Sequence, residues 1–590
     1  MRPFLSIAMS LSLLMSLAVD PVLAQSVGQT QPSAPSATTP IQHVVVIFGE
    51  NISFDHYFAT YPTAANPPGQ PRFTAVGGTP TVNNLVTPNA PFSNLLTNNP
   101  NLSNSGNGTG ATNPFRLNRS QAHTQSMSHS YGPEQASFDG LSTAYPYAMD
   151  YFPAKTGSAG GAPNYPLVAV PAAVGTKGLV MGYFDGNTVT GIWNYAQQFA
   201  MSDNSYNSQF GPSSPGAINL IAGQTNGIVA TTNPSLPSLG SSDVADGQGG
   251  YTLIGDAEVL GDVCSATGSF NASMSGKNIG DLLNANNLSW GWFQGGFDLT
   301  VTNANGSTGC SRSTVSPITG ATVTDYSDHH EPFQYYASTQ NLTHARPLNP
   351  SVVGTPADTS NGSVSCVAAT CGNHQYDMHD FYDALNVGNL PAVSFLKAPA
   401  YQDAHPSNSN PLDEQAFVVN VINTLAQSSF WANTAVILAY DDSDGWYDHQ
   451  AAQIINGSWS TADGLTGTGA CGVQGTTAQL RGVNTANGVN GRCSPGVRTP
   501  LMVISPWAKQ NYVDHTLTIQ TSITRFIEDN WTLGQLGGGS FDAVVGTAVN
   551  GVALGKLNGM FNFVPMVPPN TTTPLLSPIT GQVTGTVTLP

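Results

Sequence analysis

The chain has 590 residues, of which only 8% are charged, and its 34 acidic residues against 16 basic residues give a formal net charge of -18 at pH 7. Such a negative balance repels nucleic acid and anionic membrane surfaces at long range, which argues against a nucleic-acid-binding function. An ordinary soluble protein carries about 25% charged residues, so we expect a largely neutral, polar surface. An anionic substrate must then be held locally, by a metal ion or by histidines.

The N-terminal stretch has the features of an export signal. Arg2 precedes an apolar run over residues 4–19, and Val22-Leu23-Ala24 precede the predicted cleavage site. This pattern predicts a signal peptide over residues 1–24 and a secreted or periplasmic protein. Residues 25–40 are rich in Ser, Thr and Pro and predict a flexible linker. Later apolar runs are too short to span a membrane, so we expect no transmembrane segment in the mature protein.

Two apolar segments, residues 43–48 and 434–439, predict buried strands of a parallel sheet. Neither segment has the alternation of a half-exposed strand. Ligands collect at the carboxyl ends of such strands in open α/β sheets. Each segment is followed closely by a pair of oxygen-bearing residues, namely Glu50-Asn51 and Asp441-Asp442.

The remaining chain shows helical patterns between strands. In chain order, we expect a helix within residues 180–201, a tight turn at 210–216 followed by a helix from Ala217, helices at 375–385 and 413–425, a strand at 501–505 and a helix at 521–533. This alternation predicts an α/β fold with a doubly wound sheet. We expect one domain over residues 41–560 with large loop insertions, and an extended Pro/Thr-rich tail over 561–590.

The six cysteines fit an oxidising compartment and form no C-x-x-C metal pattern. Many pairings are open to six cysteines. Proximity along the chain favours three local pairs: Cys264 with Cys310, Cys366 with Cys371, and Cys471 with Cys493.

A metal site is the first chemical feature that the sequence suggests. Adjacent carboxylates repel one another unless a proton or a cation neutralises them. The predicted ligands are oxygen donors, Glu50, Asn51, Asp441 and Asp442. Such a set favours Ca²⁺, Mg²⁺ or Mn²⁺ over Zn²⁺. The alternative at Asp441 and Asp442 is a solvated turn in which an aspartate caps a helix.

Histidines and one serine complete the candidate site. Histidines can bind a phosphoryl group and protonate a leaving oxygen near neutral pH, although a single histidine is more often structural. The candidates are His129, His329, His330 and His405. Ser213 lies in the rigid sequence GPSSPG, which is not the G-x-S-x-G elbow of serine hydrolases because Pro215 replaces the second glycine. We therefore expect Ser213 to act beside a metal ion rather than in a serine triad.

Six motifs in order resemble a bacterial phosphoesterase family that contains exported phospholipases C and an acid phosphatase branch: ENISFDHYF, HSYGPEQ, FGPSSPGAINLIAG, DHHEPFQYY, DAHP and YDDSDGWYDH. The resemblance implies a three-layer fold similar to alkaline phosphatase, with a central, mainly parallel sheet flanked by helices. It also implies one metal ion held by Glu50, Asn51, Ser213, Asp441 and Asp442, with Ser213 as nucleophile and His129, His329, His330 and His405 around the phosphoryl group. Asn51, His129, His330 and His405 would contact the substrate.

The resemblance also bears on the substrate. Phospholipase-like members tend to carry Thr in place of Ser213 and Glu in place of Asp442, so these two residues favour the acid phosphatase branch. We expect a secreted, metal-dependent phosphomonoesterase that forms a phosphoserine intermediate. The alternatives are a phospholipase C that cleaves phospholipid head groups, and a non-catalytic cell-surface binding protein on a phosphatase scaffold.

Overall fold

The computed structural model describes residues 34–589 except 105, 106, 108–110, 139–177, 232–241, 267, 268, 359–370, 474–477, 484 and 486. The predicted signal peptide and most of the predicted linker lie outside the described residues. Residues 34–590 group into one compact unit. Within the described part of the chain, no helix combines the length and the apolar character that a membrane crossing requires.

The centre of this unit is an eight-stranded mixed sheet. Its strands, in spatial order, are β14 (Gln375–Asp377), β11 (Trp290–Gln294), β15 (Val393–Lys397), β1 (His43–Gly49), β16 (Thr434–Tyr440), β17 (Leu501–Ile504), β4 (Ala200–Ser202) and β18 (Tyr512–Asp514). Only β17 runs against its neighbours. The expected α/β fold with a mainly parallel sheet is therefore confirmed, including the two predicted strands β1 and β16 at its centre.

One face of the sheet is covered by α4 (Ser213–Ala222), α5 (Ile279–Ala285) and α8 (Thr521–Trp531). Trp292 is paired with Phe395 in the neighbouring strand, and Phe395 is paired with Val46. The three side chains therefore lie on this same face of the sheet. Trp292 and Phe395 contact the ring of Phe333, whose short 3-10 helix packs on α4. Thr521 of α8 donates a hydrogen bond of 3.3 Å to the carbonyl of Asn219 in α4.

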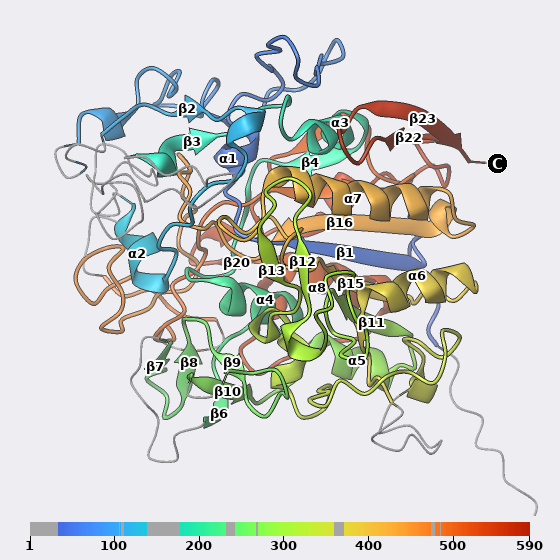
Figure 1. Ribbon diagram of the computed structural model, residues 1–590. Coiled ribbons are helices and arrows are strands. Elements are labelled where there is room, and N and C mark those ends of the chain that lie inside the picture. The colour runs from blue at the N-terminus through green and yellow to red at the C-terminus, as the bar shows by residue number, and fades with distance from the viewer. Residues whose placement is uncertain are drawn as a thin grey trace, which may run out of the picture. The chain divides into compact units, whose positions relative to one another are not determined.

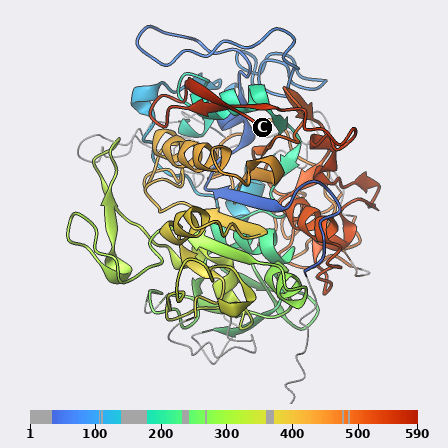
Figure 2. The ribbon, with the colours of Figure 1, turned by 90° about the vertical axis from the view of Figure 1, so that its right-hand side faces the viewer.

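The opposite face is covered by α3 (Thr190–Gln198), α6 (Met378–Asn386) and α7 (Pro411–Ala426). Phe293, one position after Trp292, packs edge-on against Phe381 of α6. Gly191 of α3 donates a hydrogen bond of 2.8 Å to Gln415 of α7. The sheet therefore lies between two helical layers, which Figures 1 and 2 show from two directions.

Two elements differ from the expectation. The predicted helix over residues 375–385 begins only at Met378, because Asp377 caps α6 with its side chain and residues 375–377 form edge strand β14. The C-terminal tail is not simply extended, since β22 (Thr572–Leu576) and β23 (Val583–Thr588) pair as an antiparallel hairpin. The hairpin packs on α7, where the Asn423 side chain donates a hydrogen bond of 2.8 Å to the Leu576 carbonyl (Figure 1).

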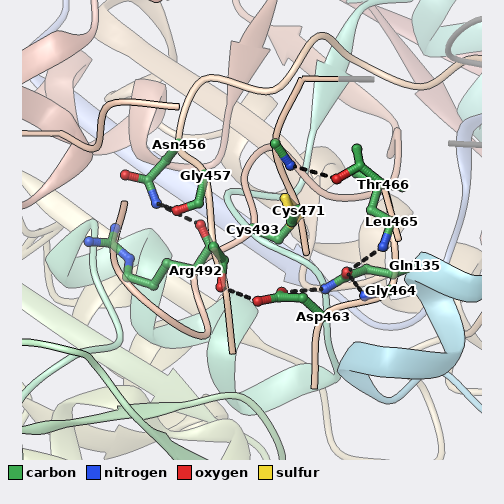
Figure 3. Close-up of a disulfide and its surroundings, with 12 residues drawn as sticks. Gln135, Asn456, Gly457, Asp463, Gly464, Leu465, Thr466, Cys471, Arg492 and Cys493 are labelled. Atoms are coloured by element: carbon green, nitrogen blue, oxygen red, sulfur yellow. Dashed lines mark hydrogen bonds between the residues drawn. A yellow bond between two sulfur atoms is a disulfide. The ribbon is translucent and has the colours of Figure 1, made fainter. Parts of the chain in front are cut away.

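Disulfides close two of the loops that the sequence predicted. Cys264 pairs with Cys310 and Cys471 pairs with Cys493, with Cα–Cα distances of 5.2 Å and 5.7 Å. Cys366 of the third expected pair lies outside the described residues. The segment before Cys471 lies beside Gln135 of α2 (Tyr131–Ala136), as Figure 3 shows. The Gln135 side chain accepts hydrogen bonds from the backbone of residues 464 and 465.

Glu528 of α8 is a buried acidic residue whose protonation affects the stability of the fold. Its side chain is almost fully buried, and burial together with the nearby Asp542 raises the pKa of Glu528 to about 9. The folded protein thus keeps a proton that the unfolded chain loses near pH ~4.5. The contribution of this group to stability is present below that pH and is lost as the pH rises toward 9.

We predict that Glu528→Gln, which has no proton to lose, removes part of this pH dependence. As the pH rises from 5 to 9, the unfolding free energy of the variant should increase relative to that of the wild type by about 1 kcal/mol or more. Unfolding by urea, followed by tryptophan fluorescence at several pH values, measures this shift. Parallel pH profiles for the two proteins would show that Glu528 does not bind the proton.

Candidate active site

The ends of β1 and β16 bring the predicted metal ligands together. Gly49 and Tyr440 are paired in the parallel register, so the residues that follow them leave the sheet side by side. The amide of Asp441 donates to the Gly49 carbonyl at 3.2 Å, and the amide of Ile52 donates to the Asp442 carbonyl at 3.0 Å. Glu50, Asn51, Asp441 and Asp442 are all at most 1% exposed. The four oxygen donors therefore share one buried edge of the sheet.

Ser213 lies directly against these carboxylates. Its hydroxyl is 3.0 Å from Oε2 of Glu50 and 3.2 Å from Oδ2 of Asp442. The expected turn at this position is wrong in one respect, because α4 begins at Ser213 itself and not at Ala217. Pro215 is accommodated in the first turn of the helix, where its missing N–H costs no hydrogen bond. Ser213 thus stands at a helix N-terminus, where backbone N–H groups favour negative charge.

Gly216 allows α4 to approach the end of β16. A Cβ atom at this position would come within 2.2 Å of the Asp441 carbonyl oxygen. The same carbonyl accepts a hydrogen bond of 2.6 Å from the Gln520 side chain. The lack of a side chain at Gly216 therefore sets how close the Ser213 hydroxyl lies to the carboxylates.

Asn51 presents an unpaired oxygen to the site. Its backbone has a φ of 61°, a left-handed conformation that Asn tolerates better than most residues. Its amide nitrogen Nδ2 donates to Oδ1 of Asp444 at 3.1 Å, while its oxygen Oδ1 is buried without a hydrogen-bond partner. A buried carbonyl oxygen without a donor is costly unless a cation faces it. The residues present therefore fit a divalent ion with oxygen ligands.

The pKa shifts of the carboxylates also fit a bound cation. Burial, followed by the charge of Glu50, raises the pKa of Asp441 to about 7. Burial also raises the pKa of Asp442 well above its usual range, and nearby His129 offsets only part of this effect. Burial alone would raise the pKa of Glu50, but Lys397 and other partners outweigh burial and lower it. A cation bound here would remove the repulsion that otherwise favours protonation.

Lys397 is a component of the site that the sequence reasoning missed. It ends β15, is fully buried, and lies 3.2 Å from Oδ2 of Asp441 while also contacting Oε1 of Glu50. The only signal in the sequence is a lysine inside an apolar strand, in a chain with few basic residues. A buried lysine is rare unless it is paired, so this position could have been noted as a site candidate.

The predicted histidines lie at different depths around the carboxylates. Nδ1 of His330 is 3.1 Å from Oε1 of Glu50. Nε2 of His129 is 3.5 Å from Nδ2 of Asn51, and the His405 ring lies 6.0 Å from the His129 ring. The His329 ring packs edge-on against the His330 ring with centres 4.5 Å apart, and Nδ1 of His329 lies 3.9 Å from Oε1 of Glu258. The two adjacent histidines can approach one site because they belong to a 3-10 helix and not to a strand.

The histidines differ in charge because their neighbours differ. Burial would lower the pKa of His129, but Asp442 and Asp444 outweigh burial and raise it well above its usual value. Burial lowers the pKa of His330 well below its usual value, and the positive charges of His329 and Lys397 add to this effect. The surroundings of His129 therefore favour its cationic form, and those of His330 favour its neutral form.

Two further acidic residues hold the site in place. Asp444 accepts hydrogen bonds from Asn51 and from the Met127 backbone, at 3.1 Å and 3.0 Å, and lies 3.1 Å from Nδ1 of His129. Glu134 accepts from the Gly211 backbone at 2.8 Å and from the Ser443 hydroxyl at 2.5 Å. Glu134 therefore joins the turn before Ser213 to the loop after Asp442.

A buried ion cluster fastens the same loop to α1 (Phe54–Phe58). Arg498 lies 3.0 Å from Oδ1 of Asp448 and 3.2 Å from Oδ1 of Asp55, and His449 lies 2.7 Å from Oδ2 of Asp55. Asp448 also accepts a hydrogen bond of 3.0 Å from the Asp55 backbone. These contacts connect the segments that follow Asn51 and Asp442.

Comparison with known proteins identifies the family of this chain. Residues 41–534, most of the chain, match the phosphoesterase family. The chain belongs to the phosphoesterase family. Among curated proteins, a non-hemolytic phospholipase C of Pseudomonas aeruginosa is 33% identical over 147 residues, 24% of this chain and 20% of that protein. Phospholipase C A of Mycobacterium tuberculosis is 26% identical over 203 residues, 34% of each chain.

The phosphoesterase chain thus matches only about a fifth to a third of the length of these relatives. Among solved structures, a protein of the alkaline phosphatase superfamily from Vibrio parahaemolyticus is 11% identical and has a TM-score of 0.24, with 58% of this chain and 60% of that chain covered.

We predict that Gly216→Ala disrupts the site while leaving most of the fold intact. The added methyl group must displace either α4 or the Asp441 backbone, which moves the Ser213 hydroxyl away from the carboxylates. Titration of the purified protein with Mn²⁺ should show weaker binding by about tenfold or more. Gly77→Ala is the matched control, because a Cβ at Gly77 meets no atom within 4 Å. Equal Mn²⁺ affinity in both variants and wild type would contradict this role for Gly216.

Proposed function

We propose that this protein hydrolyses phosphoric esters, as a metal-dependent phosphomonoesterase with Ser213 as nucleophile. The observation that carries the proposal is the position of the Ser213 hydroxyl, at a helix N-terminus and within 3.0 Å and 3.2 Å of two buried carboxylates. Membership of the phosphoesterase family supports the same reaction class. A divalent ion held by Glu50, Asn51, Ser213, Asp441 and Asp442 would neutralise charge on the nucleophile and on a phosphoryl oxygen.

In the proposed reaction the Ser213 oxygen forms a bond to phosphorus as the bond from phosphorus to the ester oxygen breaks. The Ser213 proton passes to a neighbouring carboxylate, for which Asp442 and Glu50 have the right contacts. A cationic histidine gives a proton to the leaving alcohol. Water then cleaves the phosphoserine, releasing phosphate and restoring the hydroxyl.

The surrounding polar groups are suited to an anionic phosphoryl group. We infer that His129, His330 and His405 bind its oxygens together with Asn51, and that His329 completes the shell from its more exposed position. The carboxylates beside His129 favour its cationic form, whereas burial favours the neutral form of His330, which can accept or donate a hydrogen bond. Positioning and charge stabilisation supply most of the acceleration in phosphoryl transfer.

We also propose that the protein is exported and works in an oxidising compartment. The disulfides Cys264–Cys310 and Cys471–Cys493 support this location, because disulfides are rare in reducing compartments. The apolar N-terminal sequence, of the kind that directs secretion, supports it independently.

We predict that Ser213→Ala lowers kcat by about three orders of magnitude or more and leaves a folded protein that still binds a divalent ion with reduced affinity. Ser214→Ala is the matched control, because the Ser214 hydroxyl donates to Asp256 and to the His329 carbonyl rather than to Glu50 or Asp442. Steady-state hydrolysis of an aryl phosphate and calorimetric titration with Mn²⁺ measure both effects. Full activity of Ser213→Ala would rule out Ser213 as the nucleophile.

Phospholipase C activity is the second candidate, because the curated relatives bear that name. We predict that the enzyme releases phosphate from soluble monoesters faster than it releases phosphocholine from phosphatidylcholine vesicles, and that a chelator abolishes the activity. Side-by-side assays from pH 4 to pH 9 test this preference. Faster release of phosphocholine would favour the phospholipase, and no hydrolysis of either substrate would favour a non-catalytic binding protein.

A further inference from the structure

Lys397 occupies a fixed position inside the carboxylate group. It is the last residue of β15, and its side chain lies on the same face of the sheet as α4, with Nζ 5.2 Å from the centre of the Phe48 ring. The Lys397 side chain is 0% exposed. It reaches Glu50 and Asp441 from the neighbouring strand, whereas Ser213 reaches Glu50 and Asp442 from the start of α4.

Ser213 and Lys397 contact different carboxylate oxygens, and Oε1 of Glu50 also lies 3.1 Å from Nδ1 of His330. Ser213 contacts Oε2 of Glu50 and Oδ2 of Asp442. Lys397 contacts the other oxygen of Glu50, Oε1, and Oδ2 of Asp441. Glu50 therefore bridges two positions, one beside the nucleophile and one filled by the ammonium group of Lys397.

The charges explain why such a division is stable. Glu50 and Asp441 belong to a larger set of buried acidic residues that includes Asp442, Asp403 and Asp444, and Lys397 offsets part of their charge from a fixed position. A second divalent ion bridging Glu50 and Asp441 would place its charge beside that ammonium group, which is costly in a low-dielectric site. It would also need the space between Glu50 and Asp441, which Nζ of Lys397 already fills.

We propose that Lys397 acts as a built-in second cation that restricts this site to one divalent ion. Phosphoesterases with two-metal centres place their ions about 3.5–4 Å apart on shared carboxylates. Lys397 fills the second of these positions and holds Glu50 and Asp441 in place for the single ion. Lys397 is thus a positioning residue, and its role rests on the metal-dependent function proposed above.

Manganese binding to the full chain tests this role. Wild-type protein is stripped with a chelator, dialysed against excess Mn²⁺, and measured for bound metal and for its electron paramagnetic resonance spectrum. We expect one Mn²⁺ per chain with the spectrum of an isolated ion. In Lys397→Ala, which removes both the charge and the filled space, we expect two Mn²⁺ per chain and the altered spectrum of two coupled ions.

The controls separate this inference from the proposed function. Lys277→Ala, at an exposed lysine, should bind one ion as the wild type does. Lys397→Ser is a second variant with the same expectation as Lys397→Ala, and circular dichroism checks the fold of both. Two coupled ions in the wild type would overturn the proposal whether or not the variants fold.

The remaining outcomes point to different errors. A folded Lys397→Ala protein that binds a single ion with unchanged affinity overturns the role of Lys397, while chelator-sensitive hydrolysis by the wild type leaves the proposed function standing. A wild-type protein that binds no Mn²⁺ and hydrolyses no phosphoric ester overturns both proposals.

Discussion

Three carboxylates buried at the edge of one sheet are the constraint around which the described structure is arranged. Glu50, Asp441 and Asp442 are at most 1% exposed and repel one another. Water cannot screen charges at this depth, so the protein itself must supply compensating groups. Lys397 approaches from the next strand, and the Ser213 hydroxyl approaches from a helix N-terminus. Lys397 and Ser213 are therefore placed where they offset the repulsion among these carboxylates.

The precision of the site comes from polar contacts outside the hydrophobic core. Apolar packing fixes the sheet, but it leaves the loops after β1 and β16 free to adopt several paths. Asp444 and Glu134 bind backbone and side-chain donors on different loops, and Arg498 joins Asp55 to Asp448. Because each of these groups is buried, losing one partner would leave a charge or an oxygen unsatisfied. The loops are therefore held in one conformation.

The sequence predicted the parts of this structure that depend on local patterns. Unbroken apolar runs identified β1 and β16, and the oxygen donors that follow them could then be placed at one edge. Lys397 was missed because its meaning depends on a strand register that joins residues far apart in the chain. The start of α4 at Ser213 was missed because proline suggested a turn, and the C-terminal hairpin because its pairing depends on packing against α7.

The two innermost histidines show how position decides chemical role. His129 faces Asp444 and Asp442, which favour its cationic form, whereas His330 lies near the positive groups His329 and Lys397, which disfavour it. Identical side chains in one site thus differ in the charge state that their surroundings favour. We infer that a phosphoryl group bound between them meets charge on one side and an adaptable hydrogen-bond partner on the other. This asymmetry would orient the group before any bond breaks.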